Sequence, residues 1–143
     1  MLKGINPVLS SDLLKILWDM GHGDELVITD AHYPAHSKSP DRVVDAAGVD
    51  VAPLLKGIAP LFELDPEVPP AMIQDTQKDP ADPQVEKDFR EALGYGGEIV
   101  RMGRFDFYDR ATKAYAVVRT GELRKYGCII ITKGVTNNGK GWR

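Results

Sequence analysis

The stretch from Gly21 to His36 reads Gly-His-Gly-Asp-Glu-Leu-Val-Ile-Thr-Asp-Ala-His-Tyr-Pro-Ala-His, and it decides how the chain is expected to fold. Its apolar run, residues 26–28, predicts a buried β-strand over residues 25–29. Titratable side chains lie at both ends of this strand, and they include all three histidines of the sequence. The rest of the chain is therefore expected to hold this segment in place.

An amphipathic helix is expected directly before this strand. Its apolar side chains recur at helical spacing, at Leu13, Leu14, Leu17 and Trp18. Ser10 or Ser11 is a suitable N-cap, and Gly21 is expected to end the helix as a glycine at the C′ position. His22 is then expected on a tight loop between two packed elements.

Helices and strands are expected to alternate over the rest of the chain. Apolar spacing and favourable first residues predict helices over residues 50–64, 83–93 and 104–114, whereas residues 31–39 are expected to form an irregular loop. Short apolar runs predict strands over residues 43–44, 71–75, 98–102, 115–119 and 128–132. This alternation predicts an α/β fold, a single layered domain with a mostly parallel sheet flanked by helices.

Length and charge limit the class of protein. A chain of 143 residues has single-domain size, and we expect one domain over residues 1–136 and a Gly/Asn-rich tail over residues 137–143. A net charge of -3 without a basic block argues against nucleic acid or an anionic membrane as the main partner. No segment approaches the roughly 20 apolar residues of a membrane span, and residues 1–7 lack the apolar region of a signal peptide. The single cysteine, Cys128, favours a cytoplasmic location.

His32 and His36, with the acids around them, could bind a metal ion, because imidazole and carboxylate are common ligands. Pro34 lies between them, however, and disfavours the helix that their spacing would need. Hydrogen bonds to the backbone of the loop are the simpler role for these two histidines.

His22 also allows two interpretations. It could interact only with the dipole of the preceding helix. Alternatively it is a general acid and base, because an imidazole can donate and accept a proton near neutral pH. An acidic residue across the strand would then orient it, although Asp30 lies at the far end of the strand and could instead bind a substrate hydroxyl. Sugars suit such a pocket, since each hydroxyl needs donors and acceptors.

Several blocks of sequence resemble the L-fucose mutarotase family, the sister of D-ribose pyranase. They are Gly21-His-Gly-Asp-Glu25, Asp30-Ala-His-Tyr-Pro-Ala-His-Ser37, Pro60-Leu-Phe-Glu-Leu-Asp65, Arg104-Phe-Asp-Phe-Tyr-Asp-Arg110, Thr120-Gly-Glu122 with Lys125-Tyr-Gly127, and Lys133-Gly-Val135. The blocks occur in one order over nearly the whole chain, which makes the resemblance more specific than a single motif.

The resemblance implies a sugar-binding α/β fold in ring-shaped homo-oligomers, commonly decamers, with sites near subunit boundaries. It implies an isomerase without a cofactor or metal, which interconverts the α and β anomers of a reducing monosaccharide such as L-fucose. His22 corresponds to the proton donor of the family. The substrate-binding positions correspond to Asp30, Arg104, Tyr126, Gly127 and Cys128.

Cys128 departs from the family, which usually has asparagine at this position. A thiol is a weak hydrogen-bonding group, so a polar contact worth about 0.5–1.5 kcal/mol would be lost. The resemblance therefore predicts the reaction more directly than the preferred sugar. Two other classes stay open at this point: a non-catalytic sugar-binding or transport-accessory protein that uses the same pocket, and a metal-dependent hydrolase.

Overall fold

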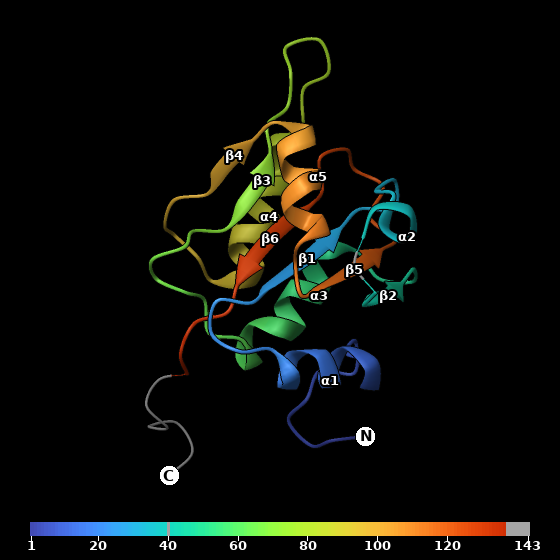
Figure 1. Ribbon diagram of the computed structural model, residues 1–143, viewed down its shortest axis with the longest axis vertical. Helices are drawn as coiled ribbons and strands as arrows, with labels where there is room; N and C mark the ends of the chain where they lie inside the picture. Colours follow the sequence, from blue (N-terminus) through green and yellow to red (C-terminus); the bar gives the residue numbers. More distant parts are fainter. Residues whose placement is uncertain (40, 137–143) are drawn as a thin grey trace.

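The structure is a computed structural model that describes residues 1–39 and 41–136 (Figure 1). The tail that the sequence sets apart, residues 137–143, lies outside the described residues. The elements in chain order are α1 (Ser11–Asp19), β1 (Glu25–Thr29), α2 (Ala35–Lys38), β2 (Val43–Ala46), α3 (Val51–Ile58), the 3₁₀ helix η1 (Ala59–Leu61), β3 (Ala71–Ile73), α4 (Pro83–Leu93), β4 (Val100–Met102), α5 (Arg104–Thr112), β5 (Ala116–Thr120) and β6 (Ile129–Thr132). No helix among them is long and apolar enough to cross a membrane.

All six of these strands form one sheet in the order β2-β5-β1-β6-β3-β4. β1 and β2 both pair with β5 in parallel, and β3 pairs with β4 in parallel. β6 runs antiparallel to both of its neighbours, β1 and β3. The expected α/β domain with a mostly parallel sheet is confirmed. The reversed β6 has a consequence for function, because its first residues lie beside the last residues of β1 and β3.

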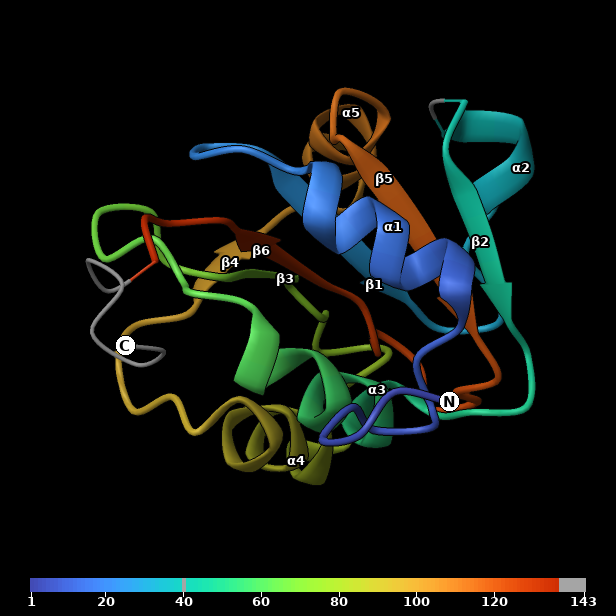
Figure 2. The same cartoon turned by 90° about the horizontal axis from the view of Figure 1, so that it is seen from below.

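Helices cover both faces of the sheet (Figure 2). α1, α3 and α4 pack on the face that carries Leu26 and Ile28, and α5 packs on the face that carries Val27. These three strand residues are fully buried. Burial on both faces explains why β1 is a continuous apolar run rather than an alternating one.

Two local expectations are wrong. Residues 31–39 are not wholly irregular, because the one-turn helix α2 begins directly after Pro34. Proline fits before a first turn, where no intrahelical partner for its missing N–H is needed. The second half of the expected helix over residues 50–64 is also absent; Pro60 lies instead in the 3₁₀ turn η1.

The end of α1 differs from the expectation as well. Of the two expected caps, Ser10 is the one that caps its start, its side chain accepting a hydrogen bond from the Leu13 amide. Gly21, however, does not adopt the left-handed conformation, because the chain already turns extended at Met20 (φ -64°, ψ 136°). The ammonium of Lys133 donates to the carbonyls of Leu17 and Met20 at 2.6 and 2.7 Å. A distant cation therefore stabilises the end of this helix.

Candidate active site

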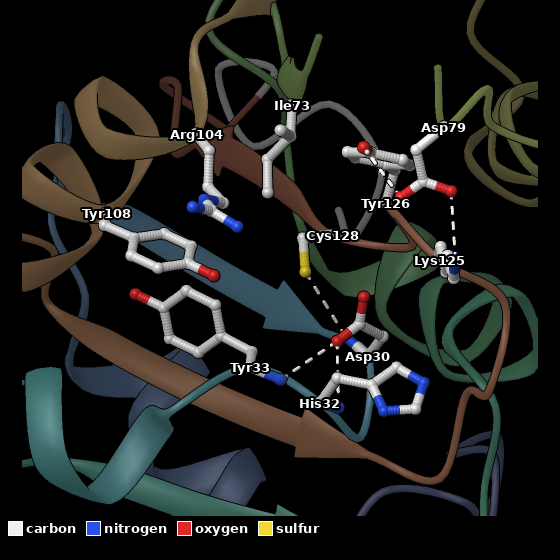
Figure 3. Close-up of a pocket in the computed structure, with 10 residues that line it drawn as sticks. All are labelled: Asp30, His32, Tyr33, Ile73, Asp79, Arg104, Tyr108, Lys125, Tyr126 and Cys128. Carbon is white, nitrogen blue, oxygen red and sulfur yellow. Dashed lines mark hydrogen bonds and ion pairs between the residues drawn. The ribbon is translucent and has the colours of Figure 1, made fainter. Parts of the chain in front are cut away.

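A pocket of about 280 Å³ opens where β1 and β3 end and β6 begins (Figure 3). Ligands of α/β folds commonly bind at this edge of a sheet. Ten residues line it: Asp30, His32, Tyr33, Ile73, Asp79, Arg104, Tyr108, Lys125, Tyr126 and Cys128. Its volume lies just below the usual range for drug-sized ligands, so it suits a smaller molecule.

Asp30 follows β1 and is buried, with 5% of its surface exposed. Its Oδ1 accepts hydrogen bonds from the backbone amides of His32 and Tyr33, both at 3.0 Å. Burial raises the pKa of this carboxyl group, and the two amide bonds only partly counteract that effect. Among the described residues its Oδ2 has no hydrogen-bond partner, so this oxygen is available to a ligand in the pocket.

Tyr126 lies on the opposite wall, in a left-handed conformation with φ 60°. This conformation costs a bulky residue of the order of 1–3 kcal/mol, and such residues gather at functional sites. The Tyr126 hydroxyl donates to Asp79 Oδ2 at 3.2 Å, and Lys125 Nζ donates to Asp79 Oδ1 at 3.0 Å. The hydrogen bond from Lys125 is the main reason that the pKa of Asp79 is lowered. The loop carrying Asp79 is thus tied to the pocket wall.

Gly127 and Cys128 complete the segment after Tyr126. A Cβ on Gly127 would lie 2.9 Å from the Arg124 carbonyl oxygen, so a larger residue does not fit there. The Cys128 thiol accepts a long hydrogen bond of 3.5 Å from the Asp30 amide. Burial raises the pKa of this thiol well above its usual value, so Cys128 is a poor nucleophile.

Arg104 is the first residue of α5 and reaches the pocket from the third side. Its guanidinium lies 4.8 Å from the centre of the Phe105 ring. Among the described residues it forms no ion pair, so it can donate to a ligand. One turn further along α5, Tyr108 packs edge to face against Tyr33, with ring centres 5.0 Å apart.

His22 lies elsewhere. It borders a separate hollow formed with Asp65 and neighbouring residues, at the start of β1, whereas Asp30 follows the end of β1. A five-residue strand spans about 17 Å, so His22 cannot reach a ligand of Asp30 in the same chain. Its side chain is 62% exposed and lies 3.1 Å from Asp65, measured from Nε2 to Oδ2.

The other two histidines lie apart from each other. His32 lines the pocket, and its Nε2 lies 3.0 Å from the Leu123 carbonyl oxygen, within hydrogen-bond distance. His36 pairs with Asp45 at 2.9 Å, away from the pocket. Within residues 1–39 and 41–136 no group of three or more histidine, cysteine or acidic side chains could hold a metal ion. The histidine cluster of the sequence is therefore not a cluster in space.

The structure thus brings four of the six candidate positions into one pocket: Asp30, Arg104, Tyr126 and Cys128. Gly127 packs behind them, and His22 lies apart. Sequence reasoning missed Asp79, because residues 78–83 carry the composition of a polar turn and give no local sign of contact with Tyr126.

Together, the fold and this pocket define a small α/β domain whose pocket is lined by carboxylates, cationic groups and tyrosine side chains, a lining that suits a polar ligand. The sequence matches the RbsD / FucU transport protein family over residues 3–136, and the chain belongs to this family.

Three relatives illustrate its range. The chain is 55% identical over 142 residues to the L-fucose mutarotase of Histophilus somni (strain 129Pt), covering 95% of this chain and 98% of that protein. The crystal structure of the fucose mutarotase in complex with L-fucose from Streptococcus pneumoniae has a TM-score of 0.87 and 39% identity, covering 94% of this chain and 99% of that one. The structure of Bacillus subtilis RbsD complexed with D-ribose is more distant, with a TM-score of 0.73 and 25% identity. It covers 94% of this chain and 98% of that one.

Proposed function

We propose that the protein is an L-fucose mutarotase, an isomerase that interconverts the α and β anomers of L-fucose without a cofactor. The observation that carries the proposal is the convergence of Asp30, Arg104 and Tyr126 on one small pocket. The chain that builds this pocket is 55% identical to an L-fucose mutarotase over nearly its whole length. Carboxylate, guanidinium and phenol groups supply the acceptors and donors that sugar hydroxyls need.

Catalysis of this reaction consists of proton transfers that accompany the opening and closing of the sugar ring. A base removes the proton of the anomeric hydroxyl, the bond between C1 and the ring oxygen breaks, and the ring oxygen takes up a proton. The open aldehyde turns about its C1–C2 bond, and the ring oxygen attacks the other face of C1 with the proton transfers reversed. A positioned acid–base group typically contributes about 10²–10⁴-fold to such a step.

The pocket residues have distinct roles in this proposal. The free oxygen of Asp30 accepts a hydrogen bond from one sugar hydroxyl, and Arg104 donates to another. Tyr126 and Cys128 form the wall between them, and Gly127 lets the backbone pass close to Asp30, whose Cβ lies 3.5 Å from the position a Gly127 Cβ would take. His22 supplies the acid–base group.

We infer that the working unit is a homo-oligomer, a ring-shaped decamer, in which His22 reaches the pocket of a neighbouring subunit. The separation of His22 and Asp30 along β1 supports this inference. So does the exposure of two large apolar side chains next to pocket residues: Phe105 beside Arg104 is 70% exposed, and Leu123, whose carbonyl oxygen lies near His32, is 74% exposed. Exposed apolar groups of this kind commonly become buried in interfaces.

The decisive test is magnetisation exchange by NMR between the two anomeric protons of L-fucose. We expect the protein to accelerate the exchange and His22→Ala to remove most of the acceleration. His36→Ala is the matched control, because it removes an exposed histidine that pairs with Asp45 outside the pocket. No acceleration with L-fucose or related sugars would overturn the proposal.

A non-catalytic sugar-binding protein is the second candidate, because one subunit alone holds a pocket without His22. Binding of L-fucose by calorimetry without anomeric exchange would favour it.

A cytoplasmic location is a further proposal, supported by the single buried thiol, Cys128, which has no second cysteine in the sequence to pair with.

A further inference from the structure

His22 and Asp65 form a histidine–carboxylate pair. The imidazole Nε2 lies 3.1 Å from Asp65 Oδ2. The carboxylate is the buried partner, with 9% of its side chain exposed against 62% for His22. Its other oxygen, Oδ1, accepts a hydrogen bond of 2.8 Å from the Glu67 amide. The carboxylate is therefore fixed by the protein, whereas most of the His22 side chain is exposed.

One backbone segment, residues 132–134 at the end of β6, holds both members of the pair. On one side, the Asp65 amide donates to the Thr132 carbonyl at 2.9 Å. On the other side, the Gly23 amide donates to the Lys133 carbonyl at 2.8 Å. A Cβ on Gly134 would lie within 3.0 Å of the backbone around Asp65, so the two segments pack without space between them. The loop of His22 and the carboxylate are thus set against each other by the sheet itself.

We propose that Asp65 is a positioning residue for His22 that fixes the imidazole as the Nε2–H tautomer and leaves Nδ1 as the atom that exchanges protons with the sugar. An ionised carboxylate only accepts hydrogen bonds, so the bond to Asp65 requires a proton on Nε2. In hydrolases with a Ser-His-Asp triad, a carboxylate likewise holds the catalytic imidazole in one tautomer. This inference rests on the proposed mutarotase function and adds a residue to its mechanism.

The proton balance follows directly. Nδ1 of the neutral ring takes the proton of the anomeric hydroxyl as the bond between C1 and the ring oxygen breaks. The same nitrogen then returns a proton to the ring oxygen, so the imidazole ends each ring opening in its starting state. Asp65 keeps the Nε2 proton in place throughout and takes no proton itself.

The first experiment determines the tautomer by two-dimensional ¹⁵N NMR of the ring nitrogens in the full-length protein at a pH where His22 is neutral. We expect Nε2 of His22 to carry the proton in the wild type. In Asp65→Asn the amide can either accept or donate, so the tautomer should become mixed or reversed. Glu67→Gln is the matched control: it removes a carboxylate bordering the same hollow, and it should leave the tautomer unchanged.

The second experiment is kinetic. Asp65→Asn should lower kcat for anomeric exchange by about 10-fold or more, a part of the 10²–10⁴-fold that a positioned acid–base group contributes. KM should stay within about 2-fold, because the residues that bind the sugar lie at the other end of the sheet. Asp65→Glu, which keeps a carboxylate, should retain the Nε2–H tautomer and recover part of kcat.

The inference is overturned if the wild-type ring carries its proton on Nδ1, or if Asp65→Asn leaves either the tautomer or kcat unchanged. If Asp65→Asn does not fold, the inference is tested by the tautomer of the wild type and by the tautomer and kcat of Asp65→Glu. Failure of the proposed function is a separate result: wild-type protein would then leave the anomeric exchange of L-fucose unchanged, whatever the tautomer of His22.

Discussion

Asp30 and His22 lie at opposite ends of the same strand, β1, one in the pocket and the other beside Asp65. A rigid five-residue strand keeps them about 17 Å or more apart within one chain. If both act on one sugar molecule, they belong to different subunits.

Mixed oligomers test this arrangement. His22→Ala and Arg104→Ala should each have little activity alone. Co-expression should restore about a quarter of wild-type activity, because random assembly at equal amounts pairs an intact His22 with an intact Arg104 at one boundary in four. Co-expression of His22→Ala with the double variant His22→Ala/Arg104→Ala is the control and should give none. Absence of recovery in oligomers proven to be mixed would place the complete site in one subunit.

Replacing Asp30 by asparagine should stabilise the free protein while it weakens sugar binding. Burial raises the pKa of Asp30, so the folded state holds its proton more tightly than the unfolded state. The contribution of Asp30 to stability is therefore full at low pH and is lost as the pH rises through its folded pKa. Asparagine keeps an oxygen for the amides of His32 and Tyr33 without a buried charge.

Thermal denaturation checks the Asp30 prediction. The Tm of Asp30→Asn should exceed that of the wild type at pH 7, and the difference should shrink towards pH 4. Asp45→Asn is the control with the opposite sign, because the hydrogen bond from His36 lowers the pKa of Asp45. A lower Tm for Asp30→Asn at pH 7 would contradict the electrostatic explanation.

Asp79 should matter for substrate affinity although it lies on a loop. Asp79→Ala removes the hydrogen bond that holds the Tyr126 hydroxyl and the ion pair with Lys125. We expect KM for L-fucose to rise by about 2–10-fold, the effect of one lost hydrogen bond, with kcat less affected. Gln77→Ala is the control on the same loop, at an exposed position. Equal kinetics for the two variants would show that Asp79 does not position Tyr126.

Cys128→Asn should strengthen sugar binding. Cys128 lines the pocket beside Asp30, where an amide could donate to a sugar hydroxyl and a thiol does so only weakly. One regained hydrogen bond would lower the Kd for L-fucose by about 2–10-fold, as measured by calorimetry. Cys128→Ser separates polarity from size, since a hydroxyl occupies less space than the amide. Weaker binding by both variants would indicate that the thiol serves packing rather than recognition.

Local sequence predicted much of this molecule. The apolar run at residues 26–28 identified β1, Ser10 identified the start of α1, and the alternation of elements gave an α/β sheet. These features depend on neighbours in the chain, through side-chain spacing and capping. The matched blocks also supplied four residues that meet in one pocket, because residue identities carry over between relatives without knowledge of their contacts.

Only the tertiary structure decided which side chains from distant parts of the chain lie in contact. β6 runs antiparallel to its neighbours and so places Cys128 next to Asp30, but no local pattern in the sequence predicts this direction. No local pattern predicts the contact of Asp79 with Tyr126 either. His22 and Asp65 are 43 positions apart in sequence, and the sequence left the acidic partner of His22 unidentified. Such pairs arise from strand order and register, which follow from burial over the whole sheet rather than from any one segment.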